Sequence, residues 1–249
     1  MTAVMVLLGF LFLKTGEKFA TQATAGPAVA EFMTALGHPL SVKFAPWVCN
    51  DPAKAVEYVT AKKPAFGIVT PGFYLAYAKA LEMKPLMEVR RTGVGEERFV
   101  VVMRKAAGEG IAAVRGQMVA TTLAAEERFV CGVVLEDKLA EVRLKSVTDA
   151  EAAAFDVVEK GEAVLLEEAT WTALAKDEAL GPKLKVVFRS AAMPGPLFVC
   201  FGKSRLEEAP VKAVLKDFDA AVIGKIRIEK FMDVDTNRLQ QAEGRFHGR

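Results

Sequence analysis

Short apolar runs alternate along the chain with longer amphipathic stretches. The clearest run is Arg98 to Arg104, a continuous apolar segment rich in β-branched residues and typical of a buried strand. The pattern predicts further strands near residues 6–11, 41–45, 66–69, 84–89, 117–120, 141–145, 163–166, 183–188 and 197–201. Between them it predicts helices near residues 27–36, 51–61, 73–81, 122–139, 149–161, 168–175 and 205–223, and a mostly helical tail over 231–249.

Several helix boundaries carry sequence signals. Asp51-Pro52 places a capping carboxylate before a proline in the first turn, and Gly161 marks a helix end. Residues 148–151 (TDAE) and 204–207 (SRLE) both fit the capping-box pattern, in which a hydroxyl and an acid three residues later satisfy the first backbone N–H groups. These signals fix where the amphipathic stretches begin.

The first apolar run admits two interpretations. Val4 to Leu13 is too short to span a bilayer, and the residues before it lack the basic charges of a secretory signal. We therefore expect Val6 to Leu11 to be a buried strand. A signal segment, with 23–25 (ATA) as its cleavage site, remains the alternative.

Strands that alternate with helices predict an α/β fold built on largely parallel sheets. The alternation forms two series of similar length, which we assign to two lobes. Lobe 1 is expected over residues 1–99 plus 201–249, and lobe 2 over residues 100–200. The apolar strands near 98–104 and 197–203 are expected to run side by side as the links between the lobes.

Charge and composition exclude several classes of protein. The chain has 33 Lys and Arg against 31 Asp and Glu, so its net charge gives no reason to expect a nucleic-acid partner or a membrane surface. Its three cysteines are widely spaced and its two histidines lie far apart, so we expect buried thiols and no metal site. No hydrolase, zinc-protease or nucleotide-loop motif occurs, and no cofactor is expected.

Two turns between a strand and a helix carry hydroxyl groups. Thr70 follows the strand near 66–69, and Thr121 with Thr122 follows the strand near 117–120. Such turns lie at the carboxyl ends of parallel strands, where ligands commonly bind, and a helix N-terminus favours anions. An anion held by one turn of each lobe is one interpretation, and simple helix capping by these residues is the other.

The segment 66–74 (FGIVTPGFY) resembles a segment of type 2 periplasmic binding proteins, and specifically of the phosphate, phosphite and phosphonate substrate-binding components of ABC transporters. Four further segments resemble the same family in the same order: 98–104, 114–120 (VRGQMVA), 149–166 and 190–194 (SAAMP). Together these segments cover about residues 38–205.

This resemblance implies a two-lobed clamshell that captures a small anionic ligand and delivers it to an ABC permease. By resemblance, Thr70, Thr121 and Thr122 would hold the anion, Tyr74 would lie near the cleft, and Glu168 would face a ligand amine. The resemblance also implies a periplasmic or other extracytoplasmic location, and we expect the protein to act as a monomer.

The chain departs from the family at the turn after the strand near 117–120. Phosphonate binders usually carry a turn there that is rich in Ser and Thr and ends in Gly, whereas this chain has Thr121-Thr122-Leu123-Ala124-Ala125. Two other functions therefore remain open: an enzyme on the same clamshell fold, or a cytosolic ligand sensor or orphan binder that has lost transport.

Overall fold

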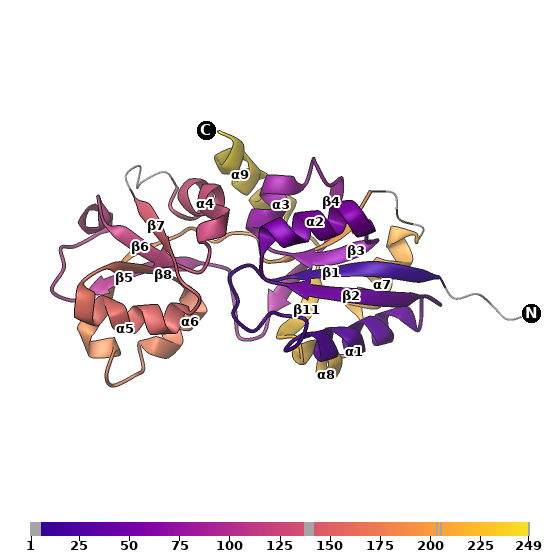
Figure 1. Cartoon of the computed structure of the whole chain (residues 1–249), viewed down its shortest axis with the longest axis horizontal. Coiled ribbons are helices and arrows are strands. Elements are labelled where there is room, and N and C mark those ends of the chain that lie inside the picture. Colours follow the sequence, from indigo (N-terminus) through magenta and orange to yellow (C-terminus); the bar gives the residue numbers. More distant parts are fainter. Residues whose placement is uncertain (1–5, 137–141, 203, 205, 249) are drawn as a thin grey trace, which may run out of the picture. The chain divides into compact units, whose positions relative to one another are not determined.

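The computed structural model describes residues 6–136, 142–202, 204 and 206–248. It contains two compact units, residues 1–95 with 194–237 and residues 96–193 with 238–249 (Figure 1). The chain thus crosses between the units three times, after Gly95, Met193 and Asn237. Residues 238–249, which the pattern assigned to the first lobe, belong with the second unit instead.

The first unit is built on a six-stranded sheet in the order β11-β4-β10-β3-β1-β2. The first four strands of the chain, β1 to β4, run in one direction, while β10 and β11 run in the other. The strand bounds are β1 Leu7–Leu13, β2 Lys43–Cys49, β3 Phe66–Val69, β4 Met83–Arg91, β10 Leu197–Phe201 and β11 Ile228–Met232.

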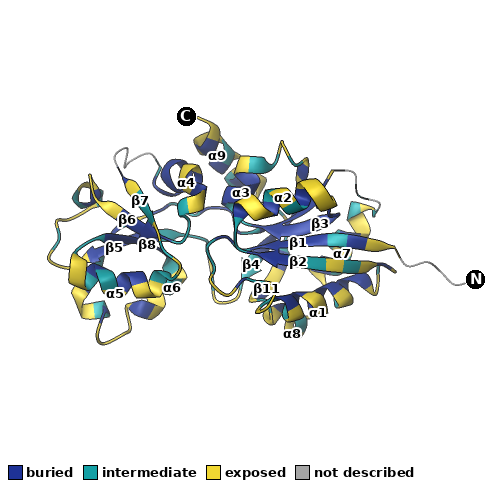
Figure 2. Cartoon of the chain, in the orientation of Figure 1, coloured by how far each residue is buried: buried dark blue, intermediate teal, exposed yellow. Residues whose placement is uncertain are grey.

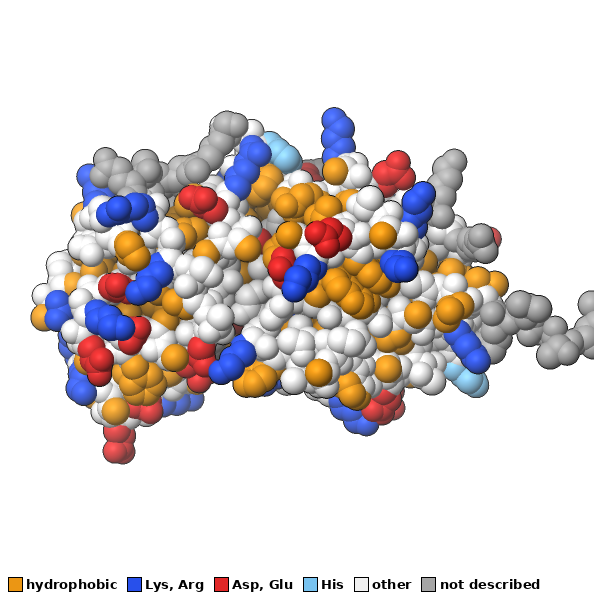
Figure 3. Space-filling model, viewed as in Figure 1, with side chains coloured by type: hydrophobic (Ala, Val, Ile, Leu, Met, Phe, Trp, Pro, Cys, Tyr) orange, Lys and Arg blue, Asp and Glu red, His pale blue; other side chains and the backbone are white. Residues whose placement is uncertain are grey.

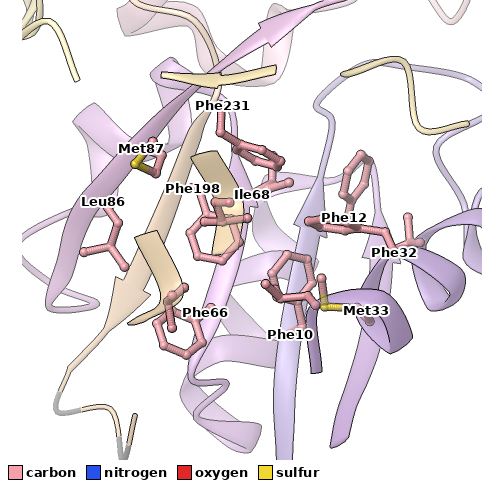
Figure 4. Close-up of a cluster of buried hydrophobic side chains, with 14 of the residues drawn as sticks. Phe10, Phe12, Phe32, Met33, Phe66, Ile68, Leu86, Met87, Phe198 and Phe231 are labelled. Atoms are coloured by element: carbon pink, nitrogen blue, oxygen red, sulfur yellow. The ribbon is translucent and has the colours of Figure 1, made fainter. Parts of the chain in front are cut away.

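Helices cover both faces of this sheet, as Figure 1 shows. Apolar side chains on one face pack with α1, α7 and α8 in a single core, which centres on Phe10, Phe32, Phe66 and Phe198 (Figure 4). The helix bounds are α1 Gly26–Gly37, α2 Pro52–Lys62, α3 Pro71–Tyr77, α7 Glu208–Lys216 and α8 Ala220–Gly224. Figure 2 shows the central strands buried and the outer faces of the helices exposed.

The first apolar run is a strand of this core. Phe10 and Leu11 are completely buried, and β1 lies between β2 and β3 in the sheet. The expected buried strand is therefore confirmed, although its first residues, Val6 and Leu7, are exposed.

The second unit repeats the strand order of the first. Its five-stranded sheet has the order β7-β6-β8-β5-β9, with only β5 antiparallel to its neighbours. This matches β2-β1-β3-β10-β4 of the first sheet, where β10 is the reversed strand. The bounds are β5 Phe99–Arg104, β6 Met118–Thr121, β7 Arg143–Ser146, β8 Ala163–Glu167 and β9 Leu184–Arg189.

The strong apolar strands near 98–104 and 197–203 do not pair with each other. β5 pairs with β8 and β9 in the second sheet, whereas β10 pairs with β3 and β4 in the first, so this part of the predicted link is wrong. Both strands are apolar because each is a central strand of its own sheet. The pairing found beside two of the crossings is a single antiparallel bridge, between Glu97 and Met193.

The helical segment after β6 is irregular. It begins as a 3₁₀ turn over Ala124–Glu126, continues as α4 Glu127–Phe129, and ends as a π-helix over Val130–Val134. The regular helix predicted to reach about Leu139 is thus wrong over this part, and residues 137–141 lie outside the described residues. α5 Ala150–Lys160 and α6 Glu168–Leu174 form close to the predicted places, and α5 ends before Gly161, which has a φ of 77°. The cap of α5 is the carboxylate of Asp149 and not the hydroxyl of Thr148, so the first capping box is wrong by one residue.

The predicted helix over 205–223 is two helices. Asp219 caps the second, α8, and the chain bends between Lys216 and Ala220. Ser204 accepts a bond from the backbone N–H of Leu206 and starts no helix, so the second capping box is wrong. The tail then adds the unpredicted strand β11 before the last helix, α9 Thr236–His247. No helix in the described part of the chain is long and apolar enough to cross a membrane.

Candidate ligand-binding site

Polar residues follow the three parallel neighbours β1, β2 and β3 at one edge of the first sheet. Thr15 comes two residues after β1, Asn50 directly follows β2, and Thr70 directly follows β3. The carboxyl ends of neighbouring parallel strands meet at one edge of a sheet. The hydroxyl oxygens of Thr15 and Thr70 are accordingly 3.2 Å apart.

Thr70 is the N-cap residue of α3, as the sequence predicts. Its hydroxyl oxygen accepts a hydrogen bond from the backbone N–H of Phe73 at 3.4 Å. Thr70 is only partly buried, whereas Thr15 and Tyr74 are each 6% exposed. Thr70 therefore presents the more accessible hydroxyl at this edge, while Tyr74, one turn into α3, packs into the first unit.

The loop between β1 and α1 is held by local hydrogen bonds. Asn50 donates its side-chain N–H to the backbone carbonyl of Glu17 at 2.9 Å, and Lys14 forms an ion pair with the Glu17 carboxylate at 3.0 Å. Partial burial opposes the charge of Glu17, but Lys14 and the backbone N–H of Phe19 outweigh it and lower the pKa of the carboxyl. The loop that carries Thr15 is thus fixed by Asn50 and by one ion pair.

The second unit carries hydroxyls at the matching place. Thr121 is the last residue of β6 and only 1% exposed; its hydroxyl oxygen accepts a bond from the backbone N–H of Leu123 at 3.1 Å. Thr122 is half-buried in the turn that follows. Thr121 therefore closes the turn, and Thr122 presents the more accessible hydroxyl. Neither residue caps a regular helix, because the segment continues as a 3₁₀ turn from Ala124.

Charged residues complete this edge of the second sheet. Glu168 begins α6 directly after β8, and its carboxylate pairs with the Arg189 guanidinium at 2.6 Å. Arg189 is the last residue of β9, and Arg98 directly precedes the reversed strand β5. The guanidinium of Arg98 binds the carboxylate of Glu96 at 2.7 Å and donates to the backbone carbonyl of Ser190 at 3.2 Å.

The structure thus gathers the predicted residues in two groups. Thr70 and Tyr74 share α3 in the first unit, while Thr121, Thr122 and Glu168 follow the neighbouring strands β6 and β8 in the second. Thr15, Asn50 and Arg189 are additions. Thr15 and Asn50 lie close behind β1 and β2 as the structure has them, but four and five residues beyond the predicted strand ends at 11 and 45, so the predicted elements did not mark them.

Other reactive groups lie away from these edges or are chemically quiet. Burial raises the pKa of the Cys49 thiol to about 11 and also raises the pKa of the Cys200 thiol, so neither is a thiolate at neutral pH. Among the described residues, no three His, Cys, Asp or Glu side chains cluster to hold a metal ion. Positive and negative side chains are interspersed over the face shown in Figure 3.

No family model and no curated protein sequence matches this chain. Solved structures do match over nearly its full length. XAC2383 from Xanthomonas citri, bound to ATP, is 13% identical, with 97% of each chain covered and a TM-score of 0.74. PhnD1 from Prochlorococcus marinus, in complex with methylphosphonate, is 13% identical, with 96% of this chain and 97% of that chain covered and a TM-score of 0.65.

A third structure is a binding protein component of an ABC phosphonate transporter, PA3383 from Pseudomonas aeruginosa. It is 12% identical, with 98% of this chain and 88% of that chain covered and a TM-score of 0.65. At identities this low, the structural matches establish the fold alone. These matches, together with the repeated strand order of the two sheets, show that the chain has the fold of type 2 periplasmic binding proteins.

Proposed function

We propose that this chain, which has the fold of type 2 periplasmic binding proteins, binds a small anionic solute for an ABC permease. It would act outside the cytoplasm as a monomer. The observation that carries the proposal is the recurrence of accessible hydroxyls, Thr70 and Thr122, after equivalent parallel strands of two sheets with the same order. Hydroxyls and backbone N–H groups are donors suited to an oxyanion.

The ligands of structural neighbours support an anion. One neighbour was solved with ATP and another with methylphosphonate, and both ligands carry phosphorus-bound oxyanions. At the carboxyl-end edge of the second sheet this chain also has the guanidinium groups of Arg98 and Arg189, whose planar forks match such oxygens; each already pairs with a carboxylate, so an oxyanion would share these donors with Glu96 and Glu168. These features favour a phosphate or phosphonate group over a neutral solute.

The ion pair of Glu168 refines the expected ligand. The resemblance implies that this acid faces a ligand amine, but its carboxylate already pairs with Arg189 at 2.6 Å. An amine on the ligand would have to compete with that guanidinium. We therefore propose that an anion without an amine, such as methylphosphonate, binds more tightly than 2-aminoethylphosphonate.

Two facts favour a binder over the alternative of an enzyme on this fold. The buried thiols have raised pKa values and are poor nucleophiles at neutral pH. The negative charge of Glu168 is also balanced by its ion pair with Arg189. Capture and release of a solute require only the donors described above.

Isothermal titration calorimetry tests this function. The wild-type protein and the Thr70→Val and Thr122→Val variants are titrated with phosphate, methylphosphonate, 2-aminoethylphosphonate, ATP, a sulfonate and a carboxylate. At about 1–1.5 kcal/mol per hydrogen bond, each variant should bind the best anion roughly 5–13-fold more weakly. Thr34→Val is the matched control, since its hydroxyl bonds only within α1, to the carbonyl of Ala30.

The control should bind like wild type. Wild-type affinity in both site variants would place the anion elsewhere, and failure of every anion on the panel to bind would contradict the proposed function.

A further inference from the structure

A buried carboxylate in the first unit binds two segments that lead to the second unit. Glu88, on β4, is 5% exposed. One carboxylate oxygen accepts a hydrogen bond from the backbone N–H of Gly195 at 2.8 Å, and the other accepts from the backbone N–H of Asp235 at 3.4 Å. Gly195 lies one residue after the crossing at 193/194, and Asp235 two residues before the crossing at 237/238. Glu88 therefore ties two of the three connecting segments to one strand.

The fit around Gly195 is too close for a side chain. A Cβ at this position would lie 2.7 Å from the carbonyl oxygen of Val89 and 3.3 Å from the Glu88 carboxylate. The backbone N–H of Val89 also donates to the carbonyl of Pro196 at 2.8 Å. The second connecting segment is thus held against β4 by its backbone alone, and a methyl group would push it away from Glu88.

The second unit holds the same two segments with a different acid. One carboxylate oxygen of Glu136 accepts from the backbone N–H of Ala191 at 3.4 Å and lies 3.4 Å from the Arg245 guanidinium, on α9. These bonds are longer than that of Glu88 to Gly195, and the Glu136 side chain is 19% exposed. The anchor in the first unit is therefore the tighter of the two.

The anchors leave little chain between them. On the second segment, Met193 bonds to Glu97 within the second unit and Gly195 bonds to Glu88 within the first, so only Pro194 lies between. On the first segment, Val94 bonds back to Arg91, and Glu97 pairs in the second unit. Any rotation of one unit against the other has to occur in these few residues.

We propose that Glu88 is a positioning residue that fixes two of the connecting segments and so confines the movement between the units to residues 95–96, 194 and the start of α9 at 236–238. A rotation of the units that accompanies the solute binding proposed above would then occur about defined points. This inference extends the proposed function, but it concerns the ligand-free protein and can be tested without any solute.

The variants are Glu88→Gln, Gly195→Ala and the control Glu208→Gln. Glutamine keeps the size of Glu88 but sets an N–H₂ donor against a backbone N–H, and alanine displaces the partner segment from the other side. Glu208 also contacts β4, through Lys84 at 2.7 Å, but it bonds to no connecting segment in the described contacts. Glu136→Gln serves as the comparison at the weaker anchor.

Two measurements on the full ligand-free chain are combined. Hydrogen exchange reports the amides of Gly195 and Asp235. Electron–electron double resonance reports the distance distribution between spin labels at Lys62→Cys and Lys160→Cys, both exposed positions, with the three native cysteines replaced by Ala. One label lies in each unit.

In Glu88→Gln we expect the amide that faces the new N–H₂ group to exchange about tenfold faster, as for the loss of one buried hydrogen bond, and the distance distribution to widen. Gly195→Ala should widen the distribution similarly, Glu136→Gln less, and Glu208→Gln not at all. A distribution of wild-type width in both Glu88→Gln and Gly195→Ala would overturn the proposal, even if the amides exchange faster. Should Glu88→Gln fail to fold, Gly195→Ala alone decides between these outcomes.

Discussion

At the residue scale, the candidate site depends on which hydroxyls face solvent and which serve the fold. Thr121 and Thr15 are almost fully buried, and Thr121 closes its own turn. Thr70 and Thr122 are more exposed. The sequence predicts the positions of Thr70, Thr121 and Thr122 at the ends of strands. It cannot predict burial, because burial depends on how the next segment folds back.

The same limit explains the residues that sequence reasoning missed. Thr15 lies 55 positions before Thr70, and the two meet only because β1 and β3 are neighbours in the sheet. Strand order is set by packing of the whole core, which no local pattern encodes. Arg189 was missed for the same reason, since its partner Glu168 lies on a different strand end.

Glu17 should make the stability of the first unit depend on pH. Its pKa is lowered in the folded protein from an ordinary value of 4.5, so its ion pair with Lys14 contributes stability above about pH 4.5. That contribution is lost as the pH falls through the lowered value. In urea unfolding, Glu17→Gln should therefore be less stable than wild type at pH 7, and the difference should shrink towards pH 3.

Lys14→Met should show the same narrowing, since it removes the partner of Glu17. A difference between wild type and Glu17→Gln that stays constant from pH 7 to pH 3 would show that the carboxylate charge contributes nothing.

At the element scale, the sequence was most informative where a helix starts on a side-chain cap. The Asp51 carboxylate accepts from the backbone N–H groups of Ala53 and Lys54, at 2.9 and 3.4 Å. Asp149 does the same for Glu151 and Ala152, at 3.1 and 3.0 Å. α2 begins where the pattern places it, and α5 begins one residue later than its capping box implies, because such caps satisfy N–H groups that a helix leaves open.

The two caps give a matched pair of stability tests, one in each unit. Asp51→Ala and Asp149→Ala should each lower the free energy of unfolding by about 1 kcal/mol, because one helix start loses its acceptor. Asp51→Asn and Asp149→Asn keep an acceptor and should stay near wild type. Chemical denaturation followed by circular dichroism measures all four, and an equal loss for Ala and Asn would contradict the capping role.

The predicted elements fail where the pattern is ambiguous or the pitch changes. The stretch 205–223 is amphipathic throughout, but Asp219 offers a new cap and divides it into α7 and α8. The segment 130–134 is buried at every position and adopts π-helical pitch, which periodicity cannot foretell. The strand β11 was missed because Ile228 to Met232 is short and lies in a charged tail.

At the scale of the whole molecule, the two units repeat one strand order with different sequences. Each sheet has four strands that run in one direction and one reversed strand inserted among them. The reversed strand β10 lies between β3 and β4, and the reversed strand β5 lies between β8 and β9. The alternation of strands and helices is enough to predict two α/β lobes. It places the boundaries between the lobes only approximately. β5 and β10, the strands nearest two of the crossings, are apolar because each is buried inside its own sheet, so their apolar character does not mark the crossings themselves.

The central claim of the proposed function is that Thr70 and Thr122 both bind the anion. Heteronuclear NMR of the ¹⁵N-labelled protein, titrated with the tightest-binding anion of the panel, tests it most directly. We predict that the amide signals of Thr70 and Phe73 in the first unit and of Thr122 and Leu123 in the second shift along one binding curve with a single dissociation constant. Shifts confined to one unit, or centred on residues away from both strand edges, would contradict it.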